Sequence, residues 1–489
     1  MKILKRSQIL AAEQGAVKNG ALSLSGLMFK AGSVFAECIA KRYDVIGSKI
    51  TVVCGKGNNG GDGLVIASRL KSLGADVSVV FPLGAPSTET AKPYLNITEK
   101  IKVLSDIPES CDILIDALFG IGLSRELEGD AAKTVKFMNI CEAKKVSVDV
   151  PSGIDCDAEF LSKTVFKADF TATFIALKPC FVMPYTSEYC GEYEVLDIGA
   201  KPLEYSFLTV PEPVFKKRPK NSHKGTFGTA LFINGSYGMC GAQILSVKAA
   251  YALGVGMCRA FVCDKNYTAF TVSIPEAVTI PVPTSIMGAP VINDDTLASE
   301  FLKSTAVLIG CGLGLNSEIY EITRKTLELT TVPTVIDADG INALASDISI
   351  LQKNKAPIII TPHPKEMSRL INKSVEEIEK NRVHYAKSFA CSYGCIVVLK
   401  GANTVIASPD GRVFINTTGN SGLAVAGSGD VLSGMIVSRL AQGDTPLAAA
   451  LASVYLHGKA ADTVAKKIGE AALLPTDVIE ELRKGGYML

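Results

Sequence analysis

The sequence lacks several features that would place it in a specialised class of protein. It contains no tryptophan, no C-x-x-C pair among its 13 cysteines, and no run of about 18 apolar residues that could cross a membrane. It also lacks a charge excess, since 50 basic residues face 49 acidic ones. We therefore expect no disulfide framework, no zinc site, no membrane association and no nucleic-acid binding. Single cysteines within apolar runs, such as Cys54 and Cys258, indicate free thiols in the cytoplasm.

The length and the order of the predicted elements indicate two domains. A chain of 489 residues is too long for one ordinary core. Short apolar runs typical of buried strands alternate with helical segments in two sets, which is typical of α/β proteins with parallel sheets. A segment rich in Pro, Lys and Glu between the sets is typical of a linker. We place the first domain at 1–212, the linker at 213–221 and the second domain at 222–489.

Three predicted strands of the first set end in glycines and oxygen donors. Lys49–Cys54 leads into GKGNNGGDG, before a helical run that starts at Leu64, while Ile113–Asp116 and Val146–Val150 lead into DALFGIG and DVPSGID. The ligand crevice of an open α/β sheet lies at the carboxyl ends of its strands, so these loops should converge. Dense oxygen donors with moderate charge suit a hard cation. Alternatively, these residues only cap helices and fix turns. The donors concerned are Asn58, Asn59, Asp62, Asp116, Asp149 and Ser152.

The strongest single indication of function in the sequence is a glycine-rich stretch near the end of the second set, NTTGNSGLAVAGSGDVLSG at 416–434. Glycines allow a backbone to approach phosphate oxygens, and the free N–H groups of a following helix point at them. Asp430 is an acid in a loop otherwise suited to anions. A carboxylate in that position is useful if it takes a proton from a hydroxyl that attacks phosphate. The alternative is a turn in which Asp430 is a helix N-cap.

Other strand ends of the second set carry polar motifs as well. They are GSYGMCGA, GCGLGLNSE, DADGINAL, TPHPKE and KGANT. His363 lies between two prolines in TPHPKE. It is either a turn residue or, because it follows a predicted strand, a residue that faces a ligand.

Taken together, these motifs resemble those of a known family over nearly the whole chain. The loops at 55–63, 116–122 and 149–155 resemble the NAD(P)H-hydrate epimerase domain. The motifs from Ser222 onward resemble the ADP-dependent NAD(P)H-hydrate dehydratase domain, which has a ribokinase-like fold. The resemblance implies an N-terminal Rossmann-like three-layer α/β/α domain and a C-terminal ribokinase-like α/β domain. It also implies repair of hydrated NADH and NADPH, in which one domain epimerises the hydrates and the other dehydrates the S form with ADP.

The resemblance assigns roles to residues of the first domain. Asn59, Asp116 and Ser152 look like ligands of a potassium ion. Asp149 looks like the catalytic acid or base, with Lys178 as a candidate partner. Residues that look like contacts of the epimerase substrate are Asn58, Asn59, Gly60, Gly61, Asp62, Gly120, Ile121, Gly122, Leu123, Ser124, Arg125, Glu126 and Asp149.

In the second domain, the resemblance assigns Asp430 as the catalytic aspartate. Residues that look like substrate contacts are Ala242, Gly314, His363 and Asp430. Residues that look like nucleotide contacts are Lys400, Gly401, Ala402, Asn403, Thr404 and Gly429. Magnesium should accompany ADP, the other partners should be hydrated NADH and NADPH, and we expect a cytoplasmic homo-oligomer.

The chain departs from the family pattern at a few positions. Phe29-Lys30 replaces a usual Glu-Asn, and Cys311, Ser421 and Ser428 replace a usual Pro, Pro and Thr. Two other functions stay open on the sequence alone. One is a ribokinase-like kinase that releases a stable phosphorylated vitamin precursor, and the other is a binding or scaffold protein with a non-catalytic N-terminal fold.

Overall fold

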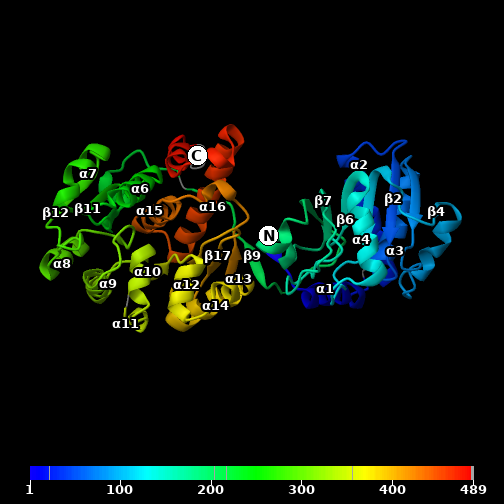
Figure 1. Cartoon of the computed structure of the whole chain (residues 1–489), viewed down its shortest axis with the longest axis horizontal. Coiled ribbons are helices and arrows are strands. Elements are labelled where there is room, and N and C mark those ends of the chain that lie inside the picture. The colour runs from blue at the N-terminus through cyan, green and yellow to red at the C-terminus, as the bar shows by residue number, and fades with distance from the viewer. Residues whose placement is uncertain (21–22, 203, 216, 355, 486–489) are drawn as a thin grey trace. The chain divides into compact units, whose positions relative to one another are not determined.

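The computed structural model describes residues 1–20, 23–202, 204–215, 217–354 and 356–485 (Figure 1). The chain divides into two compact units, Met1–Leu208 and Thr209–Leu489. Phe215 packs against the core of the second unit, and the Arg218 guanidinium lies 3.8 Å from the centre of the Phe227 ring. The described residues of segment 213–221 thus contribute to the packing of the second unit. No helix of the described residues is long and apolar enough to cross a membrane.

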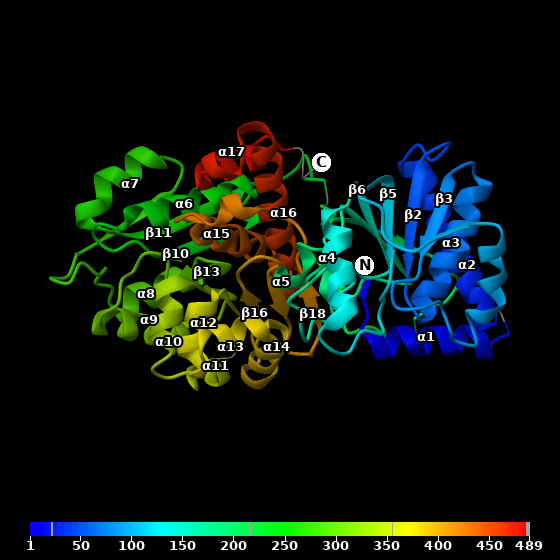
Figure 2. The same cartoon turned by 45° about the vertical axis from the view of Figure 1, so that its right-hand side comes forward.

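The first unit is a parallel sheet between two layers of helices (Figure 2). Successive residues of its central strand face opposite cores, because side chains alternate along a strand. Val52 and Cys54 pack with the helices at 24–42 and 58–72, whereas Val53 packs with the helix at 129–140. This arrangement confirms the predicted three-layer architecture. The predicted strand Lys49–Cys54 coincides with the observed one.

The strand order of the first sheet is β4-β3-β2-β5-β6-β7-β8, with parallel pairing throughout. Its strands are β2 Lys49–Cys54, β3 Asp76–Val80, β4 Lys102–Leu104, β5 Ser110–Ala117, β6 Glu142–Val148, β7 Phe170–Phe174 and β8 Glu192–Leu196. Two short strands, β1 Lys2–Ile3 and β9 Phe207–Thr209, pair with each other. The helices are α1 Arg6–Lys18, α2 Leu24–Arg42, α3 Asn58–Ser72, α4 Gly129–Ile140 and α5 Pro184–Ser187.

The second unit has a mostly parallel sheet in the order β18-β17-β16-β15-β14-β13-β10-β11-β12. Pairing is antiparallel where β17 joins β16 and β18, and it is parallel among β10 to β16. Its strands are β10 Thr229–Ile233, β11 Met257–Cys263, β12 Val278–Val282, β13 Ala306–Ile309, β14 Thr334–Ile336, β15 Ile358–Ile360, β16 Ile396–Leu399, β17 Val405–Ala407 and β18 Val413–Ile415. The predicted strand Ala306–Ile309 coincides with β13.

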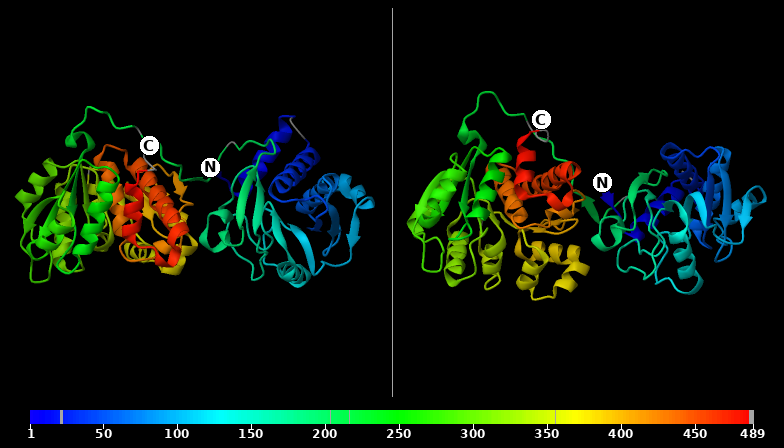
Figure 3. Two further views of the ribbon diagram at one scale, coloured as in Figure 1. Left: turned by 90° about the horizontal axis from the view of Figure 1, so that it is seen from above. Right: turned by 45° about the horizontal axis from the view of Figure 1, so that its top comes forward.

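Helices cover both faces of this second sheet (Figure 3). One layer contains α6 Cys240–Ala252, α15 Ser428–Ala441, α16 Pro446–Ile468 and α17 Pro475–Arg483, which share one apolar cluster. The other helices are α7 Tyr267–Ser273, α8 Asp294–Leu302, α9 Ser317–Leu329, α10 Ala338–Leu344, α11 Ile350–Lys353, α12 Pro364–Ile371, α13 Val375–Lys380 and α14 Arg382–Tyr393. All 13 cysteines are free thiols, and most are buried, as expected from the sequence.

Candidate active sites

The GNNGGDG motif forms the start of helix α3 rather than a loop before it. The sequence places the helix after Gly63, but α3 begins at Asn58, so that Asn58 to Asp62 belong to its first turns. The backbone approaches itself closely here, because a Cβ added at Gly60 would lie 1.8 Å from the Gly55 carbonyl oxygen. Only glycine allows this approach, which fixes the helix start beside the end of β2. The Asn58 Oδ1 accepts a hydrogen bond of 2.7 Å from Thr88.

Asp116 and Ser152 form one buried unit at the ends of β5 and β6. Both Asp116 oxygens accept hydrogen bonds from Ser152, at 2.7 Å from its hydroxyl and 2.8 Å from its backbone N–H. Burial raises the pKa of Asp116 to about 6, and the hydrogen bonds from Ser152 oppose that rise. In the described part of the chain, no lysine or arginine forms an ion pair with Asp116.

Asn59, the third predicted cation ligand, lies against the loop that follows β5. A Cβ added at Gly120 would lie 3.1 Å from the Asn59 Oδ1. The Asn59 Nδ2 is buried and has no hydrogen-bond partner among the described residues. Asn59 therefore reaches the same strand end as Asp116, where its Nδ2 can donate a hydrogen bond to a ligand.

Asp149 and Lys178 form an ion pair at the ends of β6 and β7. The Lys178 Nζ donates to the Asp149 Oδ1 at 2.5 Å and also to Thr173 and the Phe174 carbonyl oxygen, and its side chain is 0% exposed. Asp149 has a positive φ of 69°, which is uncommon outside glycine and is held here by these bonds. The same carboxylate oxygen accepts a bond from the Phe174 N–H at 3.2 Å. The predicted acid/base residue and its predicted partner are thus in direct contact.

The loop Gly120–Glu126 has two kinds of residue. Leu123 is buried in the core beneath α4, and Ile121 packs against an apolar cluster that includes Ile9 of α1. Ser124, Arg125 and Glu126 are exposed, as is Gly122. The apolar residues anchor the loop, which leaves the polar ones to meet a substrate.

In the second unit, Asp430 lies in the first turn of α15. The helix starts at Ser428, and its N-cap is Gly427 with a φ of 94°. Asp430 is therefore not the N-cap, which excludes the alternative interpretation of the glycine-rich stretch. Its side chain lies where the helix N-terminus favours negative charge.

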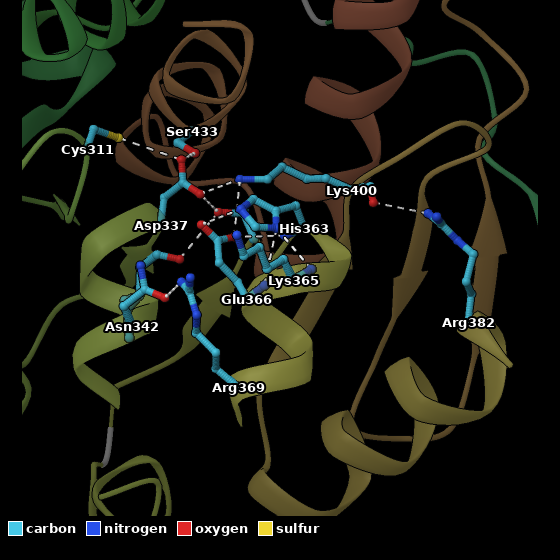
Figure 4. A network of polar contacts seen from close by, with 12 residues as sticks. Cys311, Asp337, Asn342, His363, Lys365, Glu366, Arg369, Arg382, Lys400 and Ser433 are labelled. Carbon is cyan, nitrogen blue, oxygen red and sulfur yellow. Dashed lines mark hydrogen bonds and ion pairs between the residues drawn. The ribbon is translucent and has the colours of Figure 1, made fainter. Parts of the chain in front are cut away.

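A buried ion pair between Asp337 and Lys400 lies at the ends of β14 and β16 (Figure 4). The Lys400 Nζ donates to the Asp337 Oδ1 at 2.6 Å, and Ser433 of α15 donates to the Asp337 Oδ2 at 2.7 Å. Thr361 donates to Asp337 as well, at 2.7 Å. Burial alone would raise the pKa of Asp337, but Lys400 and these hydrogen bonds hold it below its usual value. The ion pair thus links two strand ends to α15.

Asp430 lies next to this pair and to Cys311. One ligand atom from each of Cys311, Asp337 and Asp430 lies within 4.8 Å of the other two. Burial raises the pKa of Asp430 to about 6, and the nearby charge of Asp337 adds to the effect. Hydrogen bonding to the Cys311 thiol and the charge of Lys400 oppose it. A carboxylate with a pKa of about 6 can take a proton near neutral pH and release it again.

His363 serves as the N-cap of α12. Its Nδ1 accepts hydrogen bonds from the N–H groups of Lys365 and Glu366, at 3.1 and 3.2 Å. Burial and the nearby Lys400 charge lower the pKa of His363, so the ring is neutral near pH 7. Its Nε2 lies 3.3 Å from the buried Glu366 carboxylate. His363 therefore stabilises the start of α12, in addition to any contact that it makes with a ligand.

The remaining predicted residues of the second unit lie at the same edge of the sheet. A Cβ added at Gly312 would lie 2.8 Å from the Ala242 Cβ, and the Gly314 N–H donates to Asp339 at 2.7 Å. The KGANT loop is held by Arg382, which donates to the carbonyl oxygens of Leu399 and Lys400 at 3.0 and 3.2 Å. Gly401, Ala402, Asn403 and Thr404 are exposed or half-buried, so they are accessible to a nucleotide.

Comparison with known proteins identifies the family. A family model described as YjeF-related protein N-terminus matches residues 24–180, and one described as NAD(P)H-hydrate dehydratase matches residues 230–484. The bifunctional NAD(P)H-hydrate repair enzyme of Moorella thermoacetica is 34% identical, with 93% of this chain and 91% of that protein covered. The chain belongs to the bifunctional NAD(P)H-hydrate repair enzyme family. The Escherichia coli member is 33% identical, with 95% and 90% covered.

Among solved structures, a ribokinase-like superfamily protein of Enterococcus faecalis is 26% identical. It covers 58% of this chain and 97% of its own, with a TM-score of 0.50. The predicted ribokinase-like fold of the second unit is confirmed.

The site of the second unit also contains two acids that were not selected from the sequence. Asp337 and Glu366 occur in the motifs DADGINAL and TPHPKE, so the signal was present, but the pairing with Lys400 was not visible. Of the family departures, Cys311 contacts the Asp337 carboxylate, with its Sγ 3.7 Å from Oδ2. Phe29 is half exposed and stacks on Tyr94, with ring centres 6.5 Å apart.

Proposed function

We propose that the chain repairs hydrated NADH and NADPH in two steps, one in each unit. The first unit interconverts the R and S hydrates. The second unit dehydrates the S hydrate with ADP, giving AMP and phosphate. The observation that carries this proposal is the position of Asp430, with its raised pKa, in the first turn of α15 beside the Asp337–Lys400 pair.

The chemistry of the second unit follows from that position. Hydroxide is a poor leaving group on ring carbon 6 of the hydrate, whereas phosphate is a good one. The hydroxyl oxygen of the hydrate attacks the β-phosphorus of ADP while Asp430 takes the hydroxyl proton, and AMP leaves. The ring nitrogen then expels phosphate, and loss of a proton from ring carbon 5 restores the dihydronicotinamide. The backbone N–H groups at the start of α15 hold the transferred phosphoryl group.

Nucleotide and magnesium binding is proposed for the same edge of the sheet. The KGANT loop and Gly429 are the proposed nucleotide contacts. A magnesium ion that arrives with phosphates needs few protein ligands. Both Asp337 oxygens already accept hydrogen bonds and Asp430 is needed as the base, so the ion would be held mainly by the phosphate oxygens of ADP and by water. When bound, magnesium would offset the negative charge of the phosphates.

A potassium ion is proposed for the first unit, held by Asn59, Asp116 and Ser152. The proposal is supported by the buried Asp116 carboxylate, which has no ion-pair partner among the residues described. A cation would offset that charge. The other partners in this proposal are small molecules. We also expect the chain to be a homo-oligomer in the cytoplasm. Light scattering of the purified chain would test the oligomeric state.

The decisive experiment follows the absorbance of NADH. The purified chain is incubated with a mixture of R- and S-hydrated NADH, magnesium and ADP, and we expect full recovery of the NADH absorbance with equal amounts of AMP and phosphate. Recovery that stops at the S fraction would contradict an epimerase in the first unit. Accumulation of a stable phosphate ester without NADH would instead support a kinase.

A further inference from the structure

Helix α1 places an acid, Glu13, near the carboxyl ends of the strands of the first sheet. Ile9 of α1 belongs to an apolar cluster with Leu4 and Ala176, against which Ile121 in the loop after β5 and Ile175 after β7 pack. Glu13 lies one helical turn after Ile9, so both side chains project from the same face of the helix. Figure 2 shows α1 running crosswise at the ends of the strands. Glu13 precedes residues 24–180, which the family model matches.

Glu13 belongs to a cluster of charged groups contributed by four separate segments. The charges of Asp149 after β6 and Lys178 after β7 act on the Glu13 carboxyl, and Glu13 in turn acts on Asp62 of α3. Burial raises the pKa of Glu13 to about 7, Asp149 raises it further, and Lys178 opposes the rise. Burial also raises the pKa of Asp62 well above its usual value, with contributions from Asp149 and Glu13.

The acids Asp149 and Glu13 of this cluster differ in whether they have a partner. The Lys178 Nζ lies 2.5 Å from the Asp149 Oδ1 and is the one cation in the cluster. Within the described residues, the half-buried Glu13 carboxyl makes no hydrogen bond or ion pair. With its pKa raised to about 7, Glu13 carries a proton in a large share of the molecules at neutral pH. Two acids in such different environments suit opposite roles in proton transfer.

We propose that Glu13 is the proton donor of the epimerisation and that Asp149 is the proton acceptor. This inference rests on the proposed function of the first unit. Asp149 takes the proton of the hydroxyl on ring carbon 6, the bond from that carbon to the ring nitrogen breaks, and an aldehyde forms. Glu13 gives its proton to the ring nitrogen, which keeps the electron pair of the broken bond. After rotation of the aldehyde, the reverse transfers close the ring with the other configuration, and both residues regain their starting states.

The test compares Glu13→Gln with the unchanged chain, and the rate of epimerisation and the rate of dehydration of the pure S hydrate are both measured. Glutamine keeps the size of the side chain but cannot donate the proton, so we expect epimerisation to fall by about 100- to 10,000-fold. Dehydration, which belongs to the second unit, should stay unchanged. Thermal unfolding of the first unit at the temperature of the unchanged chain should show that this unit is folded. Glu159→Gln is a matched control, because Glu159 is 72% exposed and pairs with Lys5 just before α1. It should leave epimerisation unchanged.

The pH profile separates proton donation from a structural role. In the unchanged chain, epimerisation should decline as the pH rises above about 7, because Glu13 then loses its proton. Glu13→Asp should recover part of the rate and keep this decline. A Glu13→Gln rate within a few-fold of the original, or a loss of rate in which the decline persists, would overturn the proposal. If the unchanged chain dehydrates the S hydrate but never epimerises, the proposed function of the first unit fails instead.

Discussion

Asp430 is the residue on which the proposed dehydration depends most directly. Asp430→Asn keeps the size of the side chain but cannot accept a proton, so the rate of dehydration should fall by about 100- to 10,000-fold. Removal of its charge also removes a repulsion of phosphate, so ADP should bind as well as before or more tightly. Steady-state kinetics and calorimetric titration with ADP measure the two effects. Loss of ADP binding along with the rate would show that Asp430 shapes the loop or holds the metal ion.

Control measurements for Asp430 use another aspartate and the pH. Asp410→Asn changes a half-exposed acid that pairs with Arg412, and it should not affect the rate. The base must be ionised to act. Because the pKa of Asp430 is raised to about 6, dehydration by the unchanged chain should decline as the pH falls through about 6. A profile that is flat between pH 5 and 8 would contradict the assignment of this base.

Asp116 is the residue that decides the potassium prediction. If a cation compensates its buried charge, potassium should raise the affinity of the first unit for hydrated NADH. Tetramethylammonium at the same ionic strength should not, because it is too bulky for the site. Asp116→Asn should abolish the difference between the two salts. Equal binding of hydrated NADH by the unchanged chain in both salts would argue against a potassium site.

At the scale of elements, strands were easier to predict than helix starts or contacts across the sheet. Short apolar runs such as Lys49–Cys54 identify buried strands, because both faces of a parallel strand are covered. The start of α3 was missed because its Asn and Gly residues are poor helix formers. A close backbone approach, invisible in the sequence, stabilises it. The Asp337–Lys400 pair joins residues 63 positions apart and depends on the order of β14, β15 and β16.

The contact between α15 and α6 predicts an effect on stability. A Cβ added at Gly434 would lie 2.1 Å from the Ser246 carbonyl oxygen, so Gly434→Ala must push the two helices apart. Overpacking of this kind costs about 1–3 kcal/mol, and thermal unfolding of the second unit should begin several degrees lower. Gly241→Ala in α6 is the matched control, since nothing lies within 4 Å of the added methyl group. Equal melting temperatures for both variants would contradict the close packing.

At the scale of the whole molecule, the two sets of strands and helices were visible in the sequence, but the packing of the segment between them was not. The Pro-, Lys- and Glu-rich composition suggested an inter-domain linker. Phe215 nevertheless packs against the apolar cluster of α6, α15, α16 and α17, and the Arg439 guanidinium lies 4.7 Å from the centre of its ring. A single aromatic residue within a polar segment gave little sign of this contact. The stability of a fragment should therefore depend on where the chain is cut between the units.

Each unit has its own apolar clusters, so each should fold and act alone. We expect a fragment of residues 209–489 to dehydrate the S hydrate at the rate of the whole chain and to leave the R hydrate untouched. Addition of a separate fragment of residues 1–208 should restore repair of the R hydrate. A fragment that starts at Lys217 lacks Phe215, and it should melt at a lower temperature than the one that starts at Thr209. Absorbance assays and thermal melts of the three fragments measure these effects. A 209–489 fragment that is folded but inactive on the S hydrate would show that the second unit needs the first for its chemistry.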